Sequence, residues 1–220
     1  PTYMSKLKTE VGADDISIVS FADDTYVIVT PPEIDRVVSI TESTLQKHIA
    51  FLKSIGMVVN ETKTEVMWIG TGAPPVDHIT VGNNLIKLST KMKALGIFIQ
   101  GNLSWDEQAE HAISKSKKLL SAFKFLRKYL TEEQFLKAAS ANYYGSVYYA
   151  SSVWFHCIKK SHKVKLTSVH FRLLRTAKKD YMMKFKRNEL TELCQRATPE
   201  QWAKFITASR VIKIVRNKEP

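Results

Sequence analysis

The sequence contains little cysteine and no long apolar run. Two cysteines, Cys157 and Cys194, occur among 220 residues, and they form no Cys-x-x-Cys pair. This spacing excludes a disulfide scaffold and favours a reducing compartment. No segment approaches the roughly 20 apolar residues of a membrane-spanning helix, and no charged-then-apolar signal segment opens the chain. We therefore expect an intracellular protein of the nucleus or cytoplasm, with no membrane partner.

Acidic residues are scarce in one half of the chain. Residues 1–110 contain 9 Lys and Arg against 14 Asp and Glu, a net charge of −5, whereas residues 111–220 contain 24 against 7, a net charge of +17. A basic half of this density attracts phosphate backbones or anionic membranes, and the acidic half could hold cations. Hydrophobic residues make up 44% of the chain, which excludes disorder as its main state.

The first half has the pattern of strands around one helix. Two β-branched runs within residues 16–29 flank Phe21-Ala22-Asp23-Asp24, and they predict a β-hairpin whose turn contains no glycine. Residues 33–55 predict a helix that ends at Gly56. Short strands are predicted at residues 79–81, 84–88 and 94–99.

The second half has a helical period from Ser104 onward. The pattern predicts helices over residues 106–130, 132–157, 163–178, 188–196 and 199–215. Capping boxes mark three of their starts, at residues 104–107, 131–134 and 198–201. The aromatic residues from Tyr143 to Phe155 predict a core cluster rather than a base-stacking platform. We expect an α+β chain that divides into residues 1–103, with strands and a helix, and residues 104–220, which are all helical.

Asp23 and Asp24 are the main candidate site. Two adjacent carboxylates repel each other unless a cation or water relieves them. Taken alone, the pair is either a solvated turn or part of a metal site. Nucleotidyl transfer requires carboxylates of this kind, because they hold the divalent ions that stabilise the attacking and leaving oxygens.

The order of several motifs supports the metal site. Phe21-Ala22-Asp23-Asp24-Thr25 precedes a helix and is followed by Gly56-Met57-x-x-Asn60-x-x-Lys63-Thr64-Glu65, Lys93-Ala94-Leu95-Gly96-Ile97 and Leu103-x-Trp105. This series, over about residues 14–155, resembles the reverse transcriptases of non-LTR, LINE-like retrotransposons. The resemblance is to the C-terminal part of the polymerase: a partial palm in residues 1–103, made of antiparallel hairpins and a helix, then a basic helical thumb and post-thumb region in residues 104–220.

The resemblance implies roles for individual residues. Asp23 and Asp24 would bind the catalytic Mg²⁺ ions, and Lys63 would neutralise or protonate the departing pyrophosphate. Lys63 could instead be a surface lysine paired with Glu61 or Glu65. The primer-grip-like hairpin would contain Lys93, Leu95, Gly96 and Ile97. The implied partners are an RNA template paired with a DNA primer, and a dNTP.

Family members also require an aspartate on an earlier palm strand, which is not seen before residue 16. We therefore expect that this chain alone is inactive as a polymerase, and that a missing upstream segment or a partner chain completes the site. A partial sheet would also expose an edge and apolar surface for association.

The helix expected over residues 106–130 is the candidate nucleic-acid contact. Residues 111–130 contain no acid, whereas a solvated helix face usually has interleaved acids. The candidate contacts are Lys115, Lys117, Lys118, Lys124, Arg127 and Lys128, with Lys178, Lys179, Lys184, Lys186 and Arg187 further on. The alternative function is a non-catalytic nucleic-acid-binding module derived from a retroelement.

Overall fold

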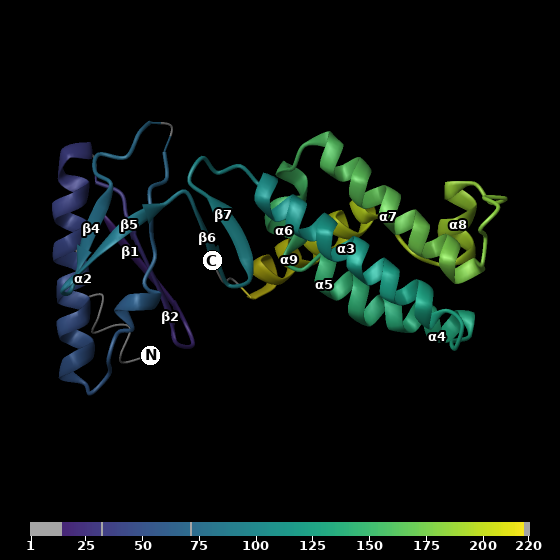
Figure 1. The fold of residues 1–220 in the computed structure, drawn as a ribbon, viewed down its shortest axis with the longest axis horizontal. Coiled ribbons are helices and arrows are strands. Elements are labelled where there is room, and N and C mark those ends of the chain that lie inside the picture. The colour runs from purple at the N-terminus through teal and green to yellow at the C-terminus, as the bar shows by residue number, and fades with distance from the viewer. Residues whose placement is uncertain (1–14, 32, 71, 218–220) are drawn as a thin grey trace. The chain divides into compact units, whose positions relative to one another are not determined.

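The computed structural model describes residues 15–31, 33–70 and 72–217. The chain separates into two compact units, one ending at Met92 and the other beginning at Lys93. The first unit contains short strands and a long helix, and the second is mostly helical (Figure 1). The α+β class is therefore confirmed.

Two antiparallel hairpins form most of the strands in the first unit. β1 (Ile16–Phe21) pairs with β2 (Asp24–Val29), as the β-branched runs predict. β4 (His78–Val81) pairs with β5 (Asn84–Ser89) around a turn in which Gly82 has a φ of 59°. β3 (Val66–Met67) lies parallel to the other edge of β5. The sequence pattern thus locates the hairpins correctly.

One helix provides the apolar surface on which these strands pack. α2 (Val37–Ser54) follows a 3-10 turn, η1 (Ile34–Arg36), and contacts β2 and β4. Ile18 of β1 packs against Phe51, and the Glu42 carboxylate accepts a hydrogen bond from the Thr80 backbone N–H at 2.8 Å. The chain leaves the helix at Gly56, where φ is 80°. Glycine adopts this left-handed conformation without steric cost, as expected for a helix end.

The boundary between the units differs from the expected one at residue 103. It falls inside β6 (Lys91–Ala94), so the turn of the β6–β7 hairpin and all of β7 (Ile97–Gln100) belong to the helical unit. The backbone N–H of Phe98 donates to Gln108 Oε1 at 3.1 Å, and Ile97 packs on the helical core. The strand expected over residues 94–99 is confirmed only for residues 97–99, because Ala94 ends β6 and the chain reverses at Leu95 and Gly96, where φ is 47° and 81°.

Two long helices form the frame of the second unit. α3 (Asp106–Leu126) and α7 (Lys160–Lys178) lie side by side (Figure 1). The apolar period of α3 predicts a core-facing stripe, and its members Ala109, Ala112, Ile113, Ser116, Leu120 and Phe123 are buried. The aromatic cluster is buried except at Tyr149, with Tyr143 and Trp154 at 0% exposure. Leu130, beyond the end of α3, is half-buried. α8 (Arg187–Leu193) and α9 (Pro199–Asn217) follow near their predicted positions.

The helix predicted over residues 132–157 is interrupted. The structure contains α4 (Glu132–Ala138), a π-helical segment η3 (Ala139–Tyr144), α5 (Gly145–Val147), α6 (Ser151–Trp154) and a 3-10 turn η4 (Phe155–Cys157). The side chains of Ser140, Asn142 and Ser146 donate to backbone carbonyls four residues earlier. Such bonds compete with the helical ladder. A left-handed φ of 49° at Ala150 then separates α5 from α6.

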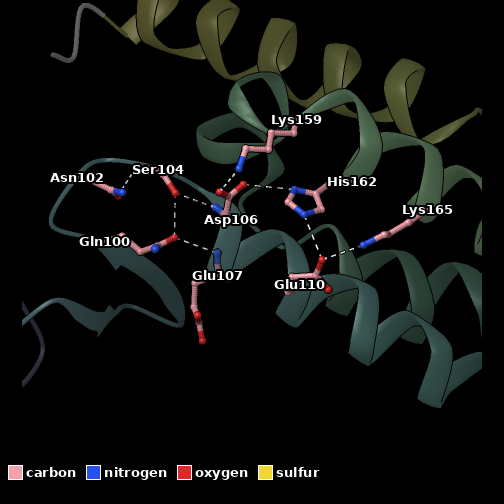
Figure 2. Close-up of polar contacts among 9 residues, drawn as sticks. All are labelled: Gln100, Asn102, Ser104, Asp106, Glu107, Glu110, Lys159, His162 and Lys165. Atoms are coloured by element: carbon pink, nitrogen blue, oxygen red, sulfur yellow. Dashed lines mark hydrogen bonds and ion pairs between the residues drawn. The ribbon is translucent and has the colours of Figure 1, made fainter.

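Two of the three predicted capping boxes form. Thr131 and Gln134 exchange hydrogen bonds at the start of α4, and Thr198 and Gln201 do so at the start of α9. At the start of α3 the box is absent. Gln100 Oε1 instead accepts from the Glu107 backbone N–H at 2.9 Å and from the Ser104 hydroxyl at 3.1 Å (Figure 2). A side chain from β7 thus takes the Glu107 N–H that the box would have used, while the Ser104 hydroxyl accepts from the Asp106 backbone N–H at 3.3 Å.

A polar network fastens the start of α7 to the start of α3 (Figure 2). The His162 ring lies between two carboxylates, with Nε2 3.1 Å from Glu110 Oε1 and Nδ1 3.5 Å from Asp106 Oδ1. The hydrogen bond from Lys159 lowers the pKa of Asp106, and the bond from Lys165 lowers that of Glu110. Lys159, Glu110 and Lys165 are exposed and Asp106 is half-buried, so the network sets the register of the two helices more than it stabilises them.

Candidate metal hairpin and nucleic-acid interface

The Asp23–Asp24 pair lies at the closed end of the β1–β2 hairpin. Asp23 is in the two-residue turn, and Asp24 is the first residue of β2, opposite Phe21. Ala22 supplies the left-handed turn residue, with a φ of 54°. Below the turn, the Ser20 and Thr25 hydroxyls are hydrogen-bonded at 3.0 Å. Both aspartates are exposed, so the hairpin presents two carboxylates to solvent.

The donor set at this end suits a hard divalent cation. Asp24 Oδ2 accepts a hydrogen bond from the Tyr26 hydroxyl at 3.3 Å, which orients that carboxylate. Mg²⁺ binds oxygen ligands and commonly uses one or two carboxylates, completing its shell with water and phosphate oxygens. No group of three His, Cys, Asp or Glu side chains that could hold a metal ion occurs within the described ranges. The pair fits an open magnesium site that needs further ligands.

The face of the hairpin opposite α2 is apolar and exposed. Val19, Phe21 and Ile28 share this face with Asp24 and are 51%, 65% and 48% exposed. A two-stranded hairpin is marginally stable by itself, and here α2 covers its other face. The sequence-based expectation of exposed apolar surface on a partial sheet is met at these residues.

Lys63 lies on a different element from the aspartates. It is the last residue of the 3-10 turn η2 (Glu61–Lys63), its side chain is exposed, and its backbone N–H donates to Asn60 O at 3.1 Å. Thr62 and Thr64 also donate to Asn60, so Asn60 organises this turn. Within the described residues, no hydrogen bond or ion pair joins Lys63 to Asp23 or Asp24. The role implied for Lys63 stays a prediction.

The primer-grip-like residues form the tip of the β6–β7 hairpin. Lys93 is in β6, Leu95 and Gly96 form the turn, and Ile97 begins β7. The Tyr149 hydroxyl donates to Leu95 O at 3.2 Å, and a Cβ at Gly96 would lie 3.4 Å from the Tyr149 ring. A left-handed leucine is sterically costly, and such strain is a recognised mark of functional segments. Tyr149 was grouped with the core residues, yet its side chain is exposed and holds this tip.

Lysines from two elements gather around His111. Lys93 lies over the Phe98 ring at 5.6 Å, and the Phe98 and His111 ring centroids are 5.1 Å apart. Partial burial lowers the pKa of His111, and the charges of Lys115, Lys93 and Lys118 lower it further. Burial is the larger cause of this shift, and the three lysines add a positive potential that Glu107 partly offsets. The structure therefore unites three predicted residues, Lys93, Lys115 and Lys118, in one cationic cluster, which we call the His111 cluster.

The other cations of α3 lie elsewhere. At about 100° per residue, Lys117 and Lys124 lie on one flank of the core-facing stripe of α3, Lys115 lies beyond the other flank, and Lys118 lies on the side away from the core; Lys128 follows the end of the helix. Lys117, Lys124 and Lys128 are exposed, and Lys115 is half-buried. The residues predicted on this helix thus form two surfaces rather than one.

Arg127 corrects the predicted contact set. It is 8% exposed, its Nε donates to Ala177 O at 2.9 Å, and its Nη1 donates to Leu130 O at 2.7 Å. Its guanidinium is therefore committed to backbone carbonyls and is not a surface phosphate ligand. Lys178 is similarly engaged, with Nζ 2.6 Å from Glu132 Oε1 and a side chain that is 18% exposed. Lys179, Lys184, Lys186 and Arg187 are exposed.

Comparison with protein-family models, with curated proteins and with solved structures finds no match. Within the described part of the chain, no helix combines the length and apolar character needed to cross a bilayer.

Proposed function

We propose that the chain is the C-terminal portion of an RNA-directed DNA polymerase, in which the first unit is part of the palm and the helical unit is the thumb. The observation that carries the proposal is the exposed Asp23–Asp24 pair at the closed end of a hairpin backed by a helix. Its substrates are a dNTP and a DNA primer paired with an RNA template.

Asp23 and Asp24 would hold Mg²⁺, which supplies charge stabilisation for the attacking and leaving oxygens. Tyr26 keeps one oxygen of Asp24 oriented by its hydrogen bond. The exposed face formed by Val19, Phe21 and Ile28 is where an upstream palm segment or a partner chain would pack and bring the remaining acid. A clean monomer of this chain by light scattering counts against association through that face.

The helical unit would hold the primer–template by its backbone. The His111 cluster combines Lys93 of the primer-grip-like hairpin with Lys115 and Lys118 of α3, and its positive potential attracts phosphates. An A-form hybrid is recognised mainly by shape and by contacts to phosphates and 2′-hydroxyls. This grip requires no base-specific contact.

Divalent-ion binding tests the hairpin. We expect Mn²⁺, added as a paramagnetic substitute for Mg²⁺, to broaden the backbone NMR signals of residues 20–27 and to be displaced by excess Mg²⁺. Asp23→Asn and Asp24→Asn should each remove the broadening, whereas the exposed control Asp35→Asn should leave it intact. Broadening that survives both hairpin substitutions would exclude a metal site there.

Primer extension tests the activity. We expect none from the 220-residue chain alone, and Mg²⁺-dependent extension once an upstream palm segment of a non-LTR reverse transcriptase is joined to it. Asp23→Ala should abolish that extension. Extension by the 220-residue chain alone, lost in Asp23→Ala, would contradict the proposal that the site is incomplete, and extension insensitive to Asp23→Ala would contradict the assignment of the site.

The second candidate, a non-catalytic nucleic-acid-binding module, is favoured by one observation. The His111 cluster belongs to a unit with its own core, separate from the unit that contains the aspartates. Both candidates require nucleic-acid binding, which a primer–template duplex can measure. Reversal of Lys93, Lys115 and Lys118 to Glu should weaken it strongly at low salt, and the same reversal at the exposed residues Lys160, Lys204 and Lys213 should weaken it less. Equal effects would mean that net charge alone drives binding.

A further inference from the structure

One end of the helical unit exposes large apolar side chains among lysines. Phe125 and Tyr129, at the end of α3, are 59% and 70% exposed, and in the loop after α7 Tyr181, Met182 and Met183 are 65%, 81% and 73% exposed. The exposed lysines of the same two segments are Lys124, Lys128, Lys179 and Lys184. We call these nine residues the Tyr129–Tyr181 surface.

Internal bonds join the two segments of this surface. Arg127 connects them, because its guanidinium donates both to Leu130 O, just beyond α3, and to Ala177 O, in the last turn of α7. The ion pair between Lys178 and Glu132 makes a second connection at 2.6 Å. The turn after α3 and the loop after α7 therefore lie together at one end of the unit.

The loop that carries Tyr181 has a defined conformation. Asp180 is 5% exposed, and its carboxylate accepts hydrogen bonds from the backbone N–H of Lys184 at 2.7 Å and of Phe185 at 3.3 Å. Arg175 also donates to this carboxylate, and it donates to Phe185 O at 3.0 Å. The buried carboxylate thus closes the loop around itself. Tyr181, Met182 and Met183 are left outside, on a preorganised turn.

The charge of this surface is positive and uncompensated. Asp180 is neutralised by Arg175, and Glu132 by Lys178. Glu133, the next acid along α4, pairs with Lys137. Lys124, Lys128, Lys179 and Lys184 have no ion pair within the described part of the chain, although Lys128 lies over the Phe125 ring at 5.8 Å.

The Tyr129–Tyr181 surface combines exposed aromatic rings with lysines that have no ion pair among the described residues, and this combination favours one class of polyanionic ligand. The Phe125 and Tyr129 rings are tilted at 58° with centroids 5.6 Å apart, so they do not stack on each other. Along a duplex the base faces are stacked on one another, so, apart from the terminal pairs, only unpaired bases can stack on aromatic rings. A duplex would supply phosphates to the lysines but nothing to the rings. An unpaired strand supplies both.

We propose that the Tyr129–Tyr181 surface binds a single-stranded segment of nucleic acid, with bases stacked on Tyr129 and Tyr181 and phosphates on the four lysines. This inference rests on the proposed function, in that the same unit holds a primer–template. It adds a second site that is selective for unpaired nucleotides.

The test measures fluorescence anisotropy with a labelled 12-nucleotide pyrimidine RNA and with a blunt 12-base-pair RNA–DNA hybrid. Tyr129→Ala and Tyr181→Ala should each weaken binding of the single strand by about 5- to 160-fold, the range for loss of one stacked base. Neither should change hybrid affinity. Tyr129→Phe and Tyr181→Phe retain the ring and should restore strand binding.

The matched control is Phe205→Ala, which removes a 62% exposed ring from α9 of the same unit. It should not affect either ligand. Far-UV circular dichroism and melting curves of each variant establish that it is folded, which is expected because every substituted ring is on the surface. Lys124→Ala and Lys184→Ala should each reduce the salt dependence of strand binding by about 0.7 in log–log slope.

Three outcomes overturn the inference separately from the proposed function. Equal loss of strand and hybrid binding in the tyrosine variants removes selectivity for unpaired bases. Unchanged strand binding in Tyr129→Ala and Tyr181→Ala removes the site, while loss of hybrid binding on reversal of Lys93, Lys115 and Lys118 leaves the proposed function intact. Binding to phosphatidylserine–phosphatidylcholine vesicles that falls in both tyrosine variants, without a change in strand affinity, assigns the surface to anionic membranes.

Discussion

Replacing Arg127 separates a structural role from a nucleic-acid-binding role. Arg127→Met keeps the length of the aliphatic side chain and removes the guanidinium, so the cavity left behind is small. The variant loses the hydrogen bonds to Ala177 O and Leu130 O, which fix the end of α3 against the end of α7. The Ala177 carbonyl then has no charged donor in a buried position.

The size of the effect follows from burial. A hydrogen bond to a charged group contributes about 1.5–3 kcal/mol, and two such bonds are lost. Water can replace the donor at the half-buried Leu130 carbonyl, and the variant no longer bears the desolvation cost of a buried guanidinium. We therefore expect a net loss of roughly 2–3 kcal/mol in the free energy of unfolding, or a melting temperature lower by roughly 6–10 °C for a unit of this size.

Urea and thermal unfolding, followed by tryptophan fluorescence and far-UV circular dichroism, measure this loss. Trp105, Trp154 and Trp202 all belong to the helical unit. The matched control is Lys128→Met, which removes the same charge one residue away from an exposed position. It should leave the free energy of unfolding within about 0.5 kcal/mol of the parent, as surface substitutions usually do.

For nucleic-acid affinity we expect the larger effect from Lys128→Met and the smaller one from Arg127→Met. Lys128→Met should lower single-strand affinity and its salt dependence, whereas Arg127→Met should retain the salt dependence at temperatures where it is folded. If Arg127→Met leaves stability unchanged and lowers the salt slope as Lys128→Met does, Arg127 is a phosphate ligand and its structural assignment is wrong.

Two further predictions concern histidines. Burial lowers the pKa of His170 from 6.5 to about 4. Between these pH values the unfolded chain therefore binds more protons than the folded chain. The free energy of unfolding should fall by roughly 3 kcal/mol as the pH drops from about 6.5 to about 4. Urea denaturation of His170→Phe across this range should lack the part of the fall in the free energy of unfolding that His170 causes. A pH profile identical to that of the parent would contradict this prediction. The pKa of His111, lowered by burial and by Lys115, Lys93 and Lys118, should rise when a hybrid duplex places phosphates beside them. Histidine ring proton NMR measures this pKa, and no change on saturation would show that the His111 cluster does not contact phosphate.

Local signals in the sequence were sufficient for much of the fold. The β-branched runs around Asp23 predicted the hairpin, and the period of apolar residues predicted α3 with its buried face. Thr131 and Thr198 predicted helix starts correctly, because each cap is made by residues three positions apart in the chain. Period and capping depend on neighbouring residues alone.

The differences arise where distant contacts decide the local structure. Gln100 caps α3 from β7, and no local pattern at Ser104 contains that information. Leu95 has no preference for a left-handed turn, yet its carbonyl accepts a bond from Tyr149, 54 residues away. Both contacts also explain why the β6–β7 turn and β7 belong to the helical unit rather than to the strands that precede them.

The candidate site residues likewise include some whose placement follows from local sequence and others whose placement depends on distant contacts. The positions of Asp23 and Asp24 in a hairpin were predictable, whereas the union of Lys93 with Lys115 and Lys118 required the packing of β7 on α3. For Arg127, the sequence did contain a pattern that indicates burial. Arg127 follows Ser116, Leu120 and Phe123 at spacings of 4, 3 and 4 residues, which is the core-facing period of α3. Its position on the buried face outweighed its charge.

The two cationic surfaces proposed for the helical unit lie at different positions along α3. Lys115 and Lys118, near the middle of the helix, belong to the His111 cluster, whereas Lys124 and Lys128, at its end and just beyond it, belong to the Tyr129–Tyr181 surface. If the His111 cluster binds duplex phosphates and the Tyr129–Tyr181 surface binds unpaired bases, as we propose, a single ligand that satisfies both is paired at the first surface and unpaired at the second. A template that extends beyond the end of its primer has this form, and it would engage the lysines of the His111 cluster by its duplex and the rings of the second surface by its free bases.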